Sequence, residues 1–192
     1  MQSLYSIGWL YLDLSPIEVC SPLEWRGKMI VGPGRVLLCF PDDYEAFLSA
    51  WNVVADCGLD RSRLIIVARR PYLHVMGKKE TEKRIAYEPS EVNRFGLAKR
   101  SLVRRVRRTR PTIAVDLYTD GAPIGAHLCL RSGAQIRAGL REEGRGRIFN
   151  FLLRGSSIGS YEDRIHALFT YLGLLPAHRD RETVGLSVDA SH

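Results

Sequence analysis

The chain has 192 residues, of which 45% are apolar and 26% are charged, and its formal net charge is +7. This length suffices for one sizeable core and is too short for two full nucleotide-binding domains facing a cleft. The composition excludes a disordered or membrane-embedded protein, because the chain is rich in apolar residues but has no run of about 18 of them. We therefore expect one soluble globular domain with extensions.

The N-terminal segment, residues 1–34, is interpreted as an addition to the main fold. It mixes β-branched and aromatic residues in "LYSIGWLYLDL" and closes with the turn cluster "VGPG", which predicts a hairpin or an arm. Its apolar run lacks a basic leading segment and is interrupted by Asp13 and Pro16, which argues against a signal peptide. The four cysteines form no C-x-x-C pair, which predicts reduced thiols in a cytoplasmic protein.

A βαβ unit is predicted from Arg35 onward. "RVLLCF" has the length and composition of a buried strand. Asp42, followed three residues later by Glu45, resembles a capping box, and the apolar residues after it recur at helical spacing until Gly58. "RLIIVA" then predicts the second buried strand.

Strands and helices continue to alternate over residues 35–176. Further strands are expected at 83–89, 112–117 and 135–140. Further helices are expected at 93–108, 122–133, 147–154 and 160–175. Because each strand is nearly all apolar, this pattern predicts a Rossmann-like α/β fold with a mostly parallel sheet and helices on both faces. Residues 177–192 are polar and are expected to form a flexible tail.

The net positive charge is concentrated in one predicted helix. Between residues 94 and 110 there are eight basic residues and no acidic one, so the rest of the chain is close to neutral. Cations without counter-charges attract phosphate, whether on lipid head groups or on nucleic acid. The alternative is a solvated helix face. The candidate anion-binding residues are Lys99, Arg100, Arg104, Arg107 and Arg108.

Acidic residues follow two of the predicted strands, where open α/β sheets bind ligands. Asp42 and Asp43 follow the first strand, and either could act as a general base on a hydroxyl group. The alternative is that Asp42 caps the helix and Asp43 is a first-turn acid. Asp116 and Asp120 flank "LYT" at the mouth of a later strand and could hold sugar hydroxyls, with Tyr118 as a stacking surface. The alternative there is a tight turn at Asp120 and a loop-capping role for Asp116.

Motifs for cofactors and metals are absent from the sequence. It contains neither the G-x-x-x-x-G-K-[ST] motif nor a G-x-G-x-x-G after the first strand, which disfavours ATP and NAD. The histidines lack the H-E-x-x-H spacing of a zinc site. We expect no cofactor and no metal.

The segment "RPTIAVDLYTDGAPIGAHLCLRSGAQIRAGL" resembles the N-terminal domain of family 9 glycosyltransferases, the ADP-heptose:lipopolysaccharide heptosyltransferases. In that family a helix leads into "pDlviDl", then a loop, a helix that ends in "SGA", and "riGf". The matching elements here are 110–117, 121–134 and 136–140. The order of the flanking elements agrees as well, so the resemblance covers about residues 35–175.

The resemblance implies the N-terminal half of a GT-B fold, which holds the sugar acceptor and supplies a catalytic aspartate after its first strand. Asp43 or Asp42 stands near that position, without the glycines of the family. Because the sequence stops where the donor-binding half would begin, we expect a domain that is inactive alone or works with a donor-binding subunit or a second copy. Its expected role is cell-envelope sugar transfer, peripheral to the inner membrane, with Arg104, Arg107 and Arg108 facing anionic lipid or lipopolysaccharide core.

The alternative function is a non-catalytic binding or assembly module. In that case the basic helix at 94–110 contacts nucleic acid, anionic lipid or a protein complex. The fold alone does not decide between the two functions.

Overall fold

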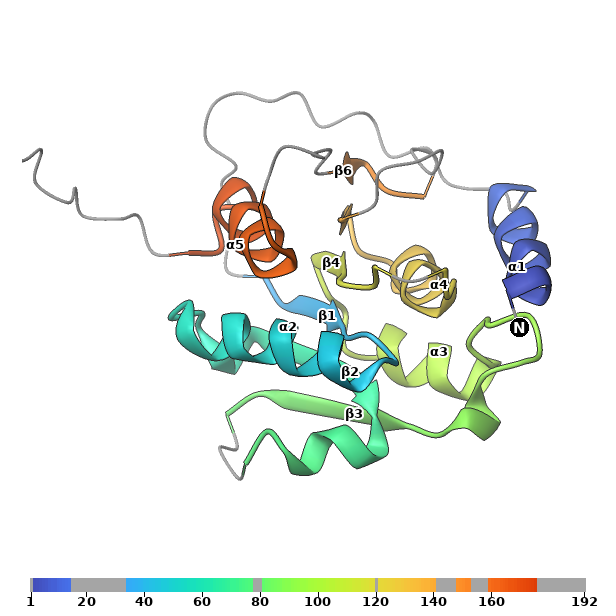
Figure 1. Cartoon of the computed structure of the whole chain (residues 1–192), viewed down its shortest axis with the longest axis horizontal. Coiled ribbons are helices and arrows are strands. Elements are labelled where there is room, and N and C mark those ends of the chain that lie inside the picture. Colours follow the sequence, from blue (N-terminus) through green and yellow to red (C-terminus); the bar gives the residue numbers. More distant parts are fainter. Residues whose placement is uncertain are drawn as a thin grey trace, which may run out of the picture.

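The computed structural model describes residues 2–14, 34–77, 81–119, 121–140, 148–152 and 159–175. Its centre is a six-stranded sheet with the order β3-β2-β1-β4-β5-β6, and the pairings within this sheet are parallel (Figure 1). The strands are β1 (Val36–Cys39), β2 (Leu64–Arg69), β3 (Lys83–Tyr87), β4 (Ile113–Asp116), β5 (Ile136–Gly139) and β6 (Phe151–Leu152). This is the strand order of dinucleotide-binding Rossmann domains. The predicted α/β fold is confirmed.

Helices cover both faces of the sheet. The helices are α1 (Gln2–Leu14), α2 (Tyr44–Asp56), α3 (Arg100–Arg107), α4 (Ile124–Arg131) and α5 (Tyr161–Tyr171), with short 3-10 turns η1 (Arg61–Arg63), η2 (Arg70–His74) and η3 (Pro89–Glu91). Successive side chains of a strand point to opposite faces. Leu37 therefore packs in the cluster with α1, α3 and α4, whereas Leu38 packs in the cluster with α2 and α5. Burial on both sides explains why β1, β2 and β4 are almost entirely apolar, whereas β3, which is less buried, begins with two basic residues.

The caps of two helices follow the sequence closely. Ser160 and Asp163 form the predicted capping box of α5, and Ser160 Oγ accepts the Asp163 N–H at 3.2 Å. The cap of α2 differs by one residue, because Asp43 rather than Asp42 accepts the Ala46 N–H, at 2.9 Å. The side chain of Asp42 is directed elsewhere, to two tyrosines described below.

The basic helix is shorter than predicted. It begins at Arg100 rather than near Asn93. Residues 93–99 form a loop in which Asn93 Oδ1 accepts the N–H groups of Phe95 at 2.9 Å and Leu97 at 3.0 Å. Gly96 has φ of 78°, which suits glycine and interrupts a helix. The local side-chain bonds therefore replace the first two predicted helical turns with a turn structure.

The helix predicted over 147–154 is wrong in its described part. Phe151–Leu152 instead pairs with β5 as a short edge strand. Asn150 fixes this arrangement, because its Oδ1 accepts the Arg137 N–H and its Nδ2 donates to the Gln135 carbonyl, each at 2.7 Å. Two side-chain bonds to β5 thus hold the segment beside the sheet.

The N-terminal segment is a helix where a strand-like hairpin or arm was expected. Tyr5, Trp9 and Leu12 recur at helical spacing and pack into the core beside α4 (Figure 1). Trp9 Nε1 donates to the Gly121 carbonyl at 2.6 Å. Aromatic residues favour strands only as a weak prior, and tertiary packing overrides it here. The rest of the expected arm, 15–33, and the expected tail, 177–192, lie outside the described residues.

No helix in the described ranges is both long enough and apolar enough to cross a bilayer.

Replacement of Gly8 by alanine should displace α1 while leaving the sheet folded. A Cβ atom at this position would lie 2.2 Å from the carbonyl oxygen of Phe95, which is backbone and cannot rotate away. Such overpacking costs about 1–3 kcal/mol. Hydrogen exchange of the α1 amides should accelerate, and that of the β1 amides should not. Ser6→Ala, on the exposed side of α1, is the matched control, and equal α1 protection in both variants contradicts the packing described.

Candidate functional site

The carboxyl ends of β1 and β4 lie side by side at the centre of the sheet. Cys39 is paired with Asp116 in the register of these strands. The chain leaves β1 toward β2 and leaves β4 toward β5, so the connections diverge in opposite directions. This divergence is the topological switch point at which open α/β sheets bind ligands. The acidic residues singled out in the sequence all follow these two strands.

Asp42 accepts hydrogen bonds from two buried tyrosines. Tyr87, at the end of β3, donates to Asp42 Oδ1, and the Tyr118 hydroxyl donates to the same oxygen at 3.2 Å. The two hydroxyls are 2.8 Å apart. Burial and then the charge of Asp42 raise the pKa of Tyr87 well above 10.0, and burial followed by Tyr87 and Asp42 raises that of Tyr118. Both phenols therefore stay protonated and hold Asp42 in place.

A third tyrosine fixes the backbone of the same loop. The Tyr72 hydroxyl, from η2, donates to the Asp42 carbonyl at 2.6 Å. Asp42 Oδ2 forms no hydrogen bond with another described residue. The carboxylate is thus held rigidly through one oxygen while the other is left for water or a ligand.

Asp43 is exposed and occupies the N-cap of α2. Its Oδ1 accepts the Ala46 N–H, and its Oδ2 has no hydrogen-bond partner among the described residues. The structure therefore gives Asp43 the capping role that the alternative interpretation assigned to Asp42. Capping through one oxygen leaves the other accessible at the carboxyl end of the sheet.

Asp116 and Tyr118 are each 1% exposed. Asp116 Oδ1 accepts the Tyr118 N–H at 3.1 Å, which is the loop-capping role considered as the alternative. Gly125 lies against this carboxylate, and a Cβ there would be 2.0 Å from Asp116 Oδ1. The Tyr118 ring offers no open face, so the expected stacking surface is not present in this structure. Asp120 lies outside the described residues.

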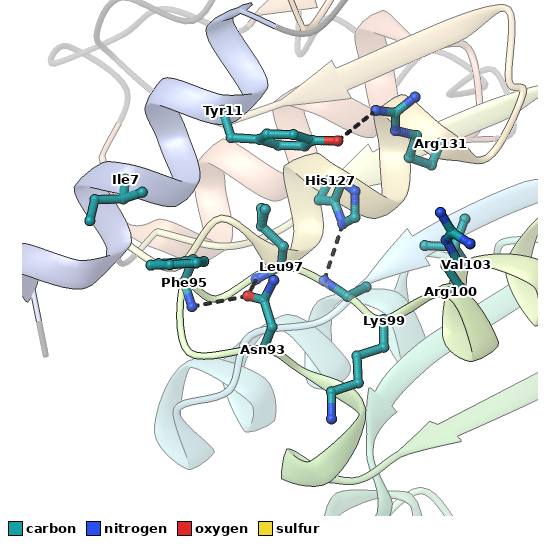
Figure 2. Close-up of a pocket in the computed structure, with 11 residues that line it drawn as sticks. Ile7, Tyr11, Asn93, Phe95, Leu97, Lys99, Arg100, Val103, His127 and Arg131 are labelled. Atoms are coloured by element: carbon teal, nitrogen blue, oxygen red, sulfur yellow. Dashed lines mark hydrogen bonds between the residues drawn. The ribbon is translucent and has the colours of Figure 1, made fainter.

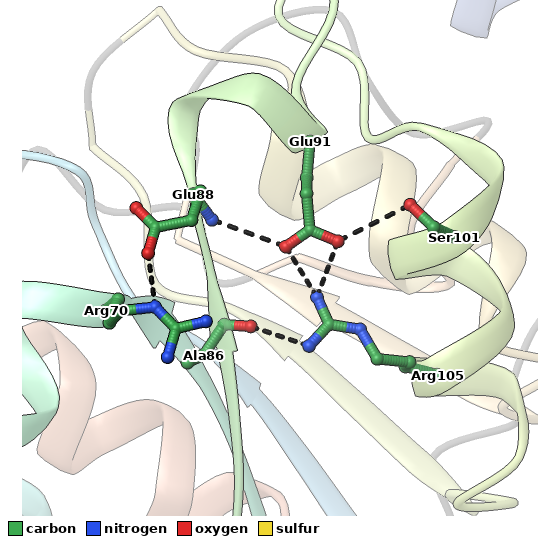
Figure 3. A network of polar contacts seen from close by, with 6 residues as sticks. All are labelled: Arg70, Ala86, Glu88, Glu91, Ser101 and Arg105. Carbon is green, nitrogen blue, oxygen red and sulfur yellow. Dashed lines mark hydrogen bonds and ion pairs between the residues drawn. The ribbon is translucent and has the colours of Figure 1, made fainter.

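The cations of the basic helix divide into two kinds. Arg105 is structural: its Nη2 donates to the Glu91 carboxylate at 2.7 and 2.8 Å, and its Nη1 donates to the Ala86 carbonyl at 2.8 Å (Figure 3). Arg70 similarly pairs with Glu88. These contacts fasten α3 and η2 to the end of β3.

The other cations form an exposed basic face. Arg100, Arg104 and Arg107 are spaced by four and three residues, so they share one side of α3. None of the side chains of this face forms an ion pair with another described residue. The basic face consists of Lys99, Arg100, Arg104, Arg107 and Arg108, which are all exposed, and their binding of an anion stays a prediction.

A groove of about 900 Å³ adjoins one end of the basic face and was not foreseen from the sequence (Figure 2). It lies between α1, the segment 93–100 and α4. Its apolar lining comes chiefly from Ile7, Phe95, Leu97 and Val103. Its polar and charged lining residues are Tyr11, Asn93, Lys99, Arg100, His127 and Arg131. The groove was missed because its wall is α1, although residues 4, 7, 11 and 14 recur at helical spacing and could have indicated this helix.

His127 connects the groove to the loop before α3. Its Nδ1 accepts the Ala98 N–H at 3.1 Å, and only 7% of the residue is exposed. Burial and the nearby Arg131 lower the pKa of His127 from 6.5 to about 4. The ring is therefore neutral at pH 7, and with Nδ1 acting as acceptor its hydrogen resides on Nε2.

Comparison with known proteins gives no relative: no protein-family model, curated protein or solved structure matches this chain. The class that the fold defines is a Rossmann-like α/β domain. Over the described ranges, no group of three or more His, Cys, Asp or Glu residues could hold a metal ion.

Acidification should remove the stabilising contribution of neutral His127. The folded state binds this proton less tightly than the unfolded state, because the pKa falls from 6.5 to about 4 on folding. The contribution is therefore complete above pH 6.5 and is lost as the pH falls to about 4, at most roughly 3 kcal/mol in all. Urea unfolding across this range should show a steeper loss for the wild type than for His127→Asn, whose amide oxygen can still accept the Ala98 N–H. If the free energies of unfolding of the two proteins fall in parallel with pH, the loss does not come from protonation of His127.

Proposed function

We propose that this chain is a glycosyltransferase-like, acceptor-side domain whose acidic rim receives the hydroxyls of a sugar. The observation that carries the proposal is the position of two carboxylates, Asp42 and Asp43, directly after the central strand β1 and beside the switch point. The resemblance of residues 110–140 to family 9 glycosyltransferases supports the same function.

The two carboxylates take different roles in this proposal. Asp43 is the base, because its exposed Oδ2 can accept the proton of an acceptor hydroxyl as that oxygen attacks the anomeric carbon of a nucleotide-sugar and the nucleotide leaves. Asp42 orients the acceptor, because Tyr87 and Tyr118 hold it in one position. The nucleotide-sugar is bound by a second domain or subunit, and this domain binds the acceptor.

Asp43→Asn should weaken acceptor binding without unfolding α2. Asparagine caps helices about as well as aspartate, so the fold is retained while the charge is lost. We expect the affinity for a phosphorylated inner-core lipopolysaccharide oligosaccharide, measured by isothermal titration calorimetry, to fall about tenfold, as for loss of a charged hydrogen bond. The control is Asp56→Asn, at the opposite end of α2. Equal affinities for the two variants would remove Asp43 from the site.

A second candidate function is a polyanion-binding module, and the basic face of α3 specifically favours it. Its five cations are exposed and have no acidic partner among the described residues, whereas the neighbouring Arg105 has one. Uncompensated charge on one helix side attracts phosphate and releases counterions on binding. This function requires no catalytic residue.

Charge reversal on α3 should abolish polyanion binding and flatten its salt dependence. We expect Arg104→Glu with Arg108→Glu to lower the affinity for a labelled DNA duplex or for anionic vesicles, and to reduce the slope of log K against log salt by about 2 on the duplex. Fluorescence anisotropy and vesicle sedimentation over a salt series separate the two partners. Arg70→Glu with Lys83→Glu carries the same charge change outside α3, and an equal loss in both double variants contradicts a specific basic face.

A further inference from the structure

We propose that the groove between α1, the segment 93–100 and α4 binds a single-chain amphiphile with an anionic head. The ligand's chain would lie along the apolar wall and its head among the cations at the edge. This site is separate from the acidic rim at the switch point, so it goes beyond the acceptor-binding function proposed above.

The dimensions and apolar wall of the groove suit an acyl chain. Its volume of about 900 Å³ falls within the range of about 300–1,000 Å³ typical of small-molecule sites. Ile7 and Phe95 face the groove from α1 and the 93–99 loop, and Val103 faces it from α3 (Figure 2). An acyl chain that covers apolar surface of this kind removes it from water, which favours binding.

Positive charge is concentrated around the same groove. Lys99, Arg100 and Arg131 line it, and none of its lining residues is acidic. Arg131 Nη2 donates to the Tyr11 hydroxyl at 3.3 Å, which orients the guanidinium between α4 and α1 (Figure 2). Charge complementarity therefore requires an anionic head rather than a neutral or cationic one.

Two further donors reinforce the preference for an anion. His127 lines the groove as a neutral ring, and its Nε2–H has no hydrogen-bond partner among the described residues. The first turn of α3 lies at the groove and has no side-chain cap, so the positive end of the helix dipole favours an anion there, beside the Glu91 carboxylate that accepts the Ser101 hydroxyl at 3.4 Å. The cations, the imidazole N–H and the helix end all favour negative charge.

The outer surface of α1 extends the apolar wall. Five of the eight exposed large hydrophobic residues in the described part of the chain belong to this helix. Leu10 is 57% exposed and Leu14 is 73% exposed. An apolar row of this length on a water-facing helix is unusual for a surface that contacts only solvent. A chain that extends beyond the groove would remain against apolar side chains.

Titration calorimetry with decanoate tests the proposal directly. Decanoate carries both the chain and the anionic head, butyrate carries the head with little chain, and decyl maltoside carries the chain with a neutral head. We expect saturable one-to-one binding of decanoate and at least tenfold weaker binding of each control. Equal binding of decyl maltoside overturns the requirement for an anion, and equal binding of butyrate overturns the requirement for the apolar wall.

Two variants with matched controls locate the site. Arg131→Gln should weaken decanoate binding about tenfold, as expected for loss of a charged hydrogen bond. The control Lys83→Gln, at an exposed residue of β3 outside the groove, should not. Ile7→Glu places a charge on the apolar wall at a residue that is 48% exposed, so the fold tolerates it, and it should weaken binding similarly. Its control is Val75→Glu, at a residue 45% exposed on the far side of the sheet. Unchanged affinity in both groove variants overturns the proposal.

The source of the amphiphile is decided with vesicles. Sedimentation with phosphatidylcholine vesicles that do or do not contain phosphatidylglycerol is compared with decanoate titration. Decanoate binding that depends on Arg131 supports a free single-chain amphiphile as ligand. Phosphatidylglycerol-dependent sedimentation that depends on both Arg131 and Ile7, without decanoate binding, overturns the proposal, because phosphatidylglycerol carries two chains and the site is then a bilayer-binding surface. If decanoate does not bind, and if vesicle sedimentation is lost in Arg104→Glu with Arg108→Glu but not in the groove variants, the groove proposal is overturned. The basic face is then the site. A dimer that Ile7→Glu dissociates, again without decanoate binding, also overturns the groove proposal, because a second copy then covers α1.

Discussion

Burial of the parallel sheet on both faces is the constraint on which the rest of this structure depends. Leu37 and Leu38 are both fully buried although they point to opposite sides of β1. Full burial of each such side chain contributes about 1.5–3 kcal/mol, so a polar residue inside a strand would forfeit a large share of a domain's net stability. Asp42 and Asp116 accordingly lie at or just beyond the carboxyl ends of β1 and β4, and Arg137 is buried inside β5 with its Nε donating to the Ile148 carbonyl at 2.7 Å.

The two acidic loops show how structural and ligand-binding roles compete at that edge. Asp116 is enclosed by the Tyr118 backbone and by Gly125, so its role is to shape the loop after β4. Asp42 is held by tyrosines from the ends of β3 and β4, but one of its oxygens is not engaged by a described residue. The fold thus orients one carboxylate and buries the other, although the sequence places both directly after strands.

The strands and most helices could be predicted because each has its own local signal. "RVLLCF" reads as a buried strand without knowledge of its neighbours, and Ser160 with Asp163 specifies where α5 begins. The errors arise where distant contacts decide. Residues 151–152 become a strand through the bonds of Asn150 to β5, and α1 becomes a helix by packing Trp9 beside Gly121. The groove depends on α1, so it could not be assembled from local patterns.

The two sides of α3 differ in whether their arginines have an acidic partner. Glu91 lies where it can bind Arg105, and this pair also caps the turn that leads into the helix, since Glu91 accepts the Glu88 N–H at 3.4 Å. Arg100 and Arg104 form no ion pair with another described residue, and the mutual repulsion of these cations opposes folding. Glu91 pairs with Arg105, so the basic face stays uncompensated beside the apolar groove. An anionic partner that binds there gains both from the charge and from the apolar wall. Among the described residues, the surface at α1 and α3 therefore combines uncompensated charge with exposed apolar side chains.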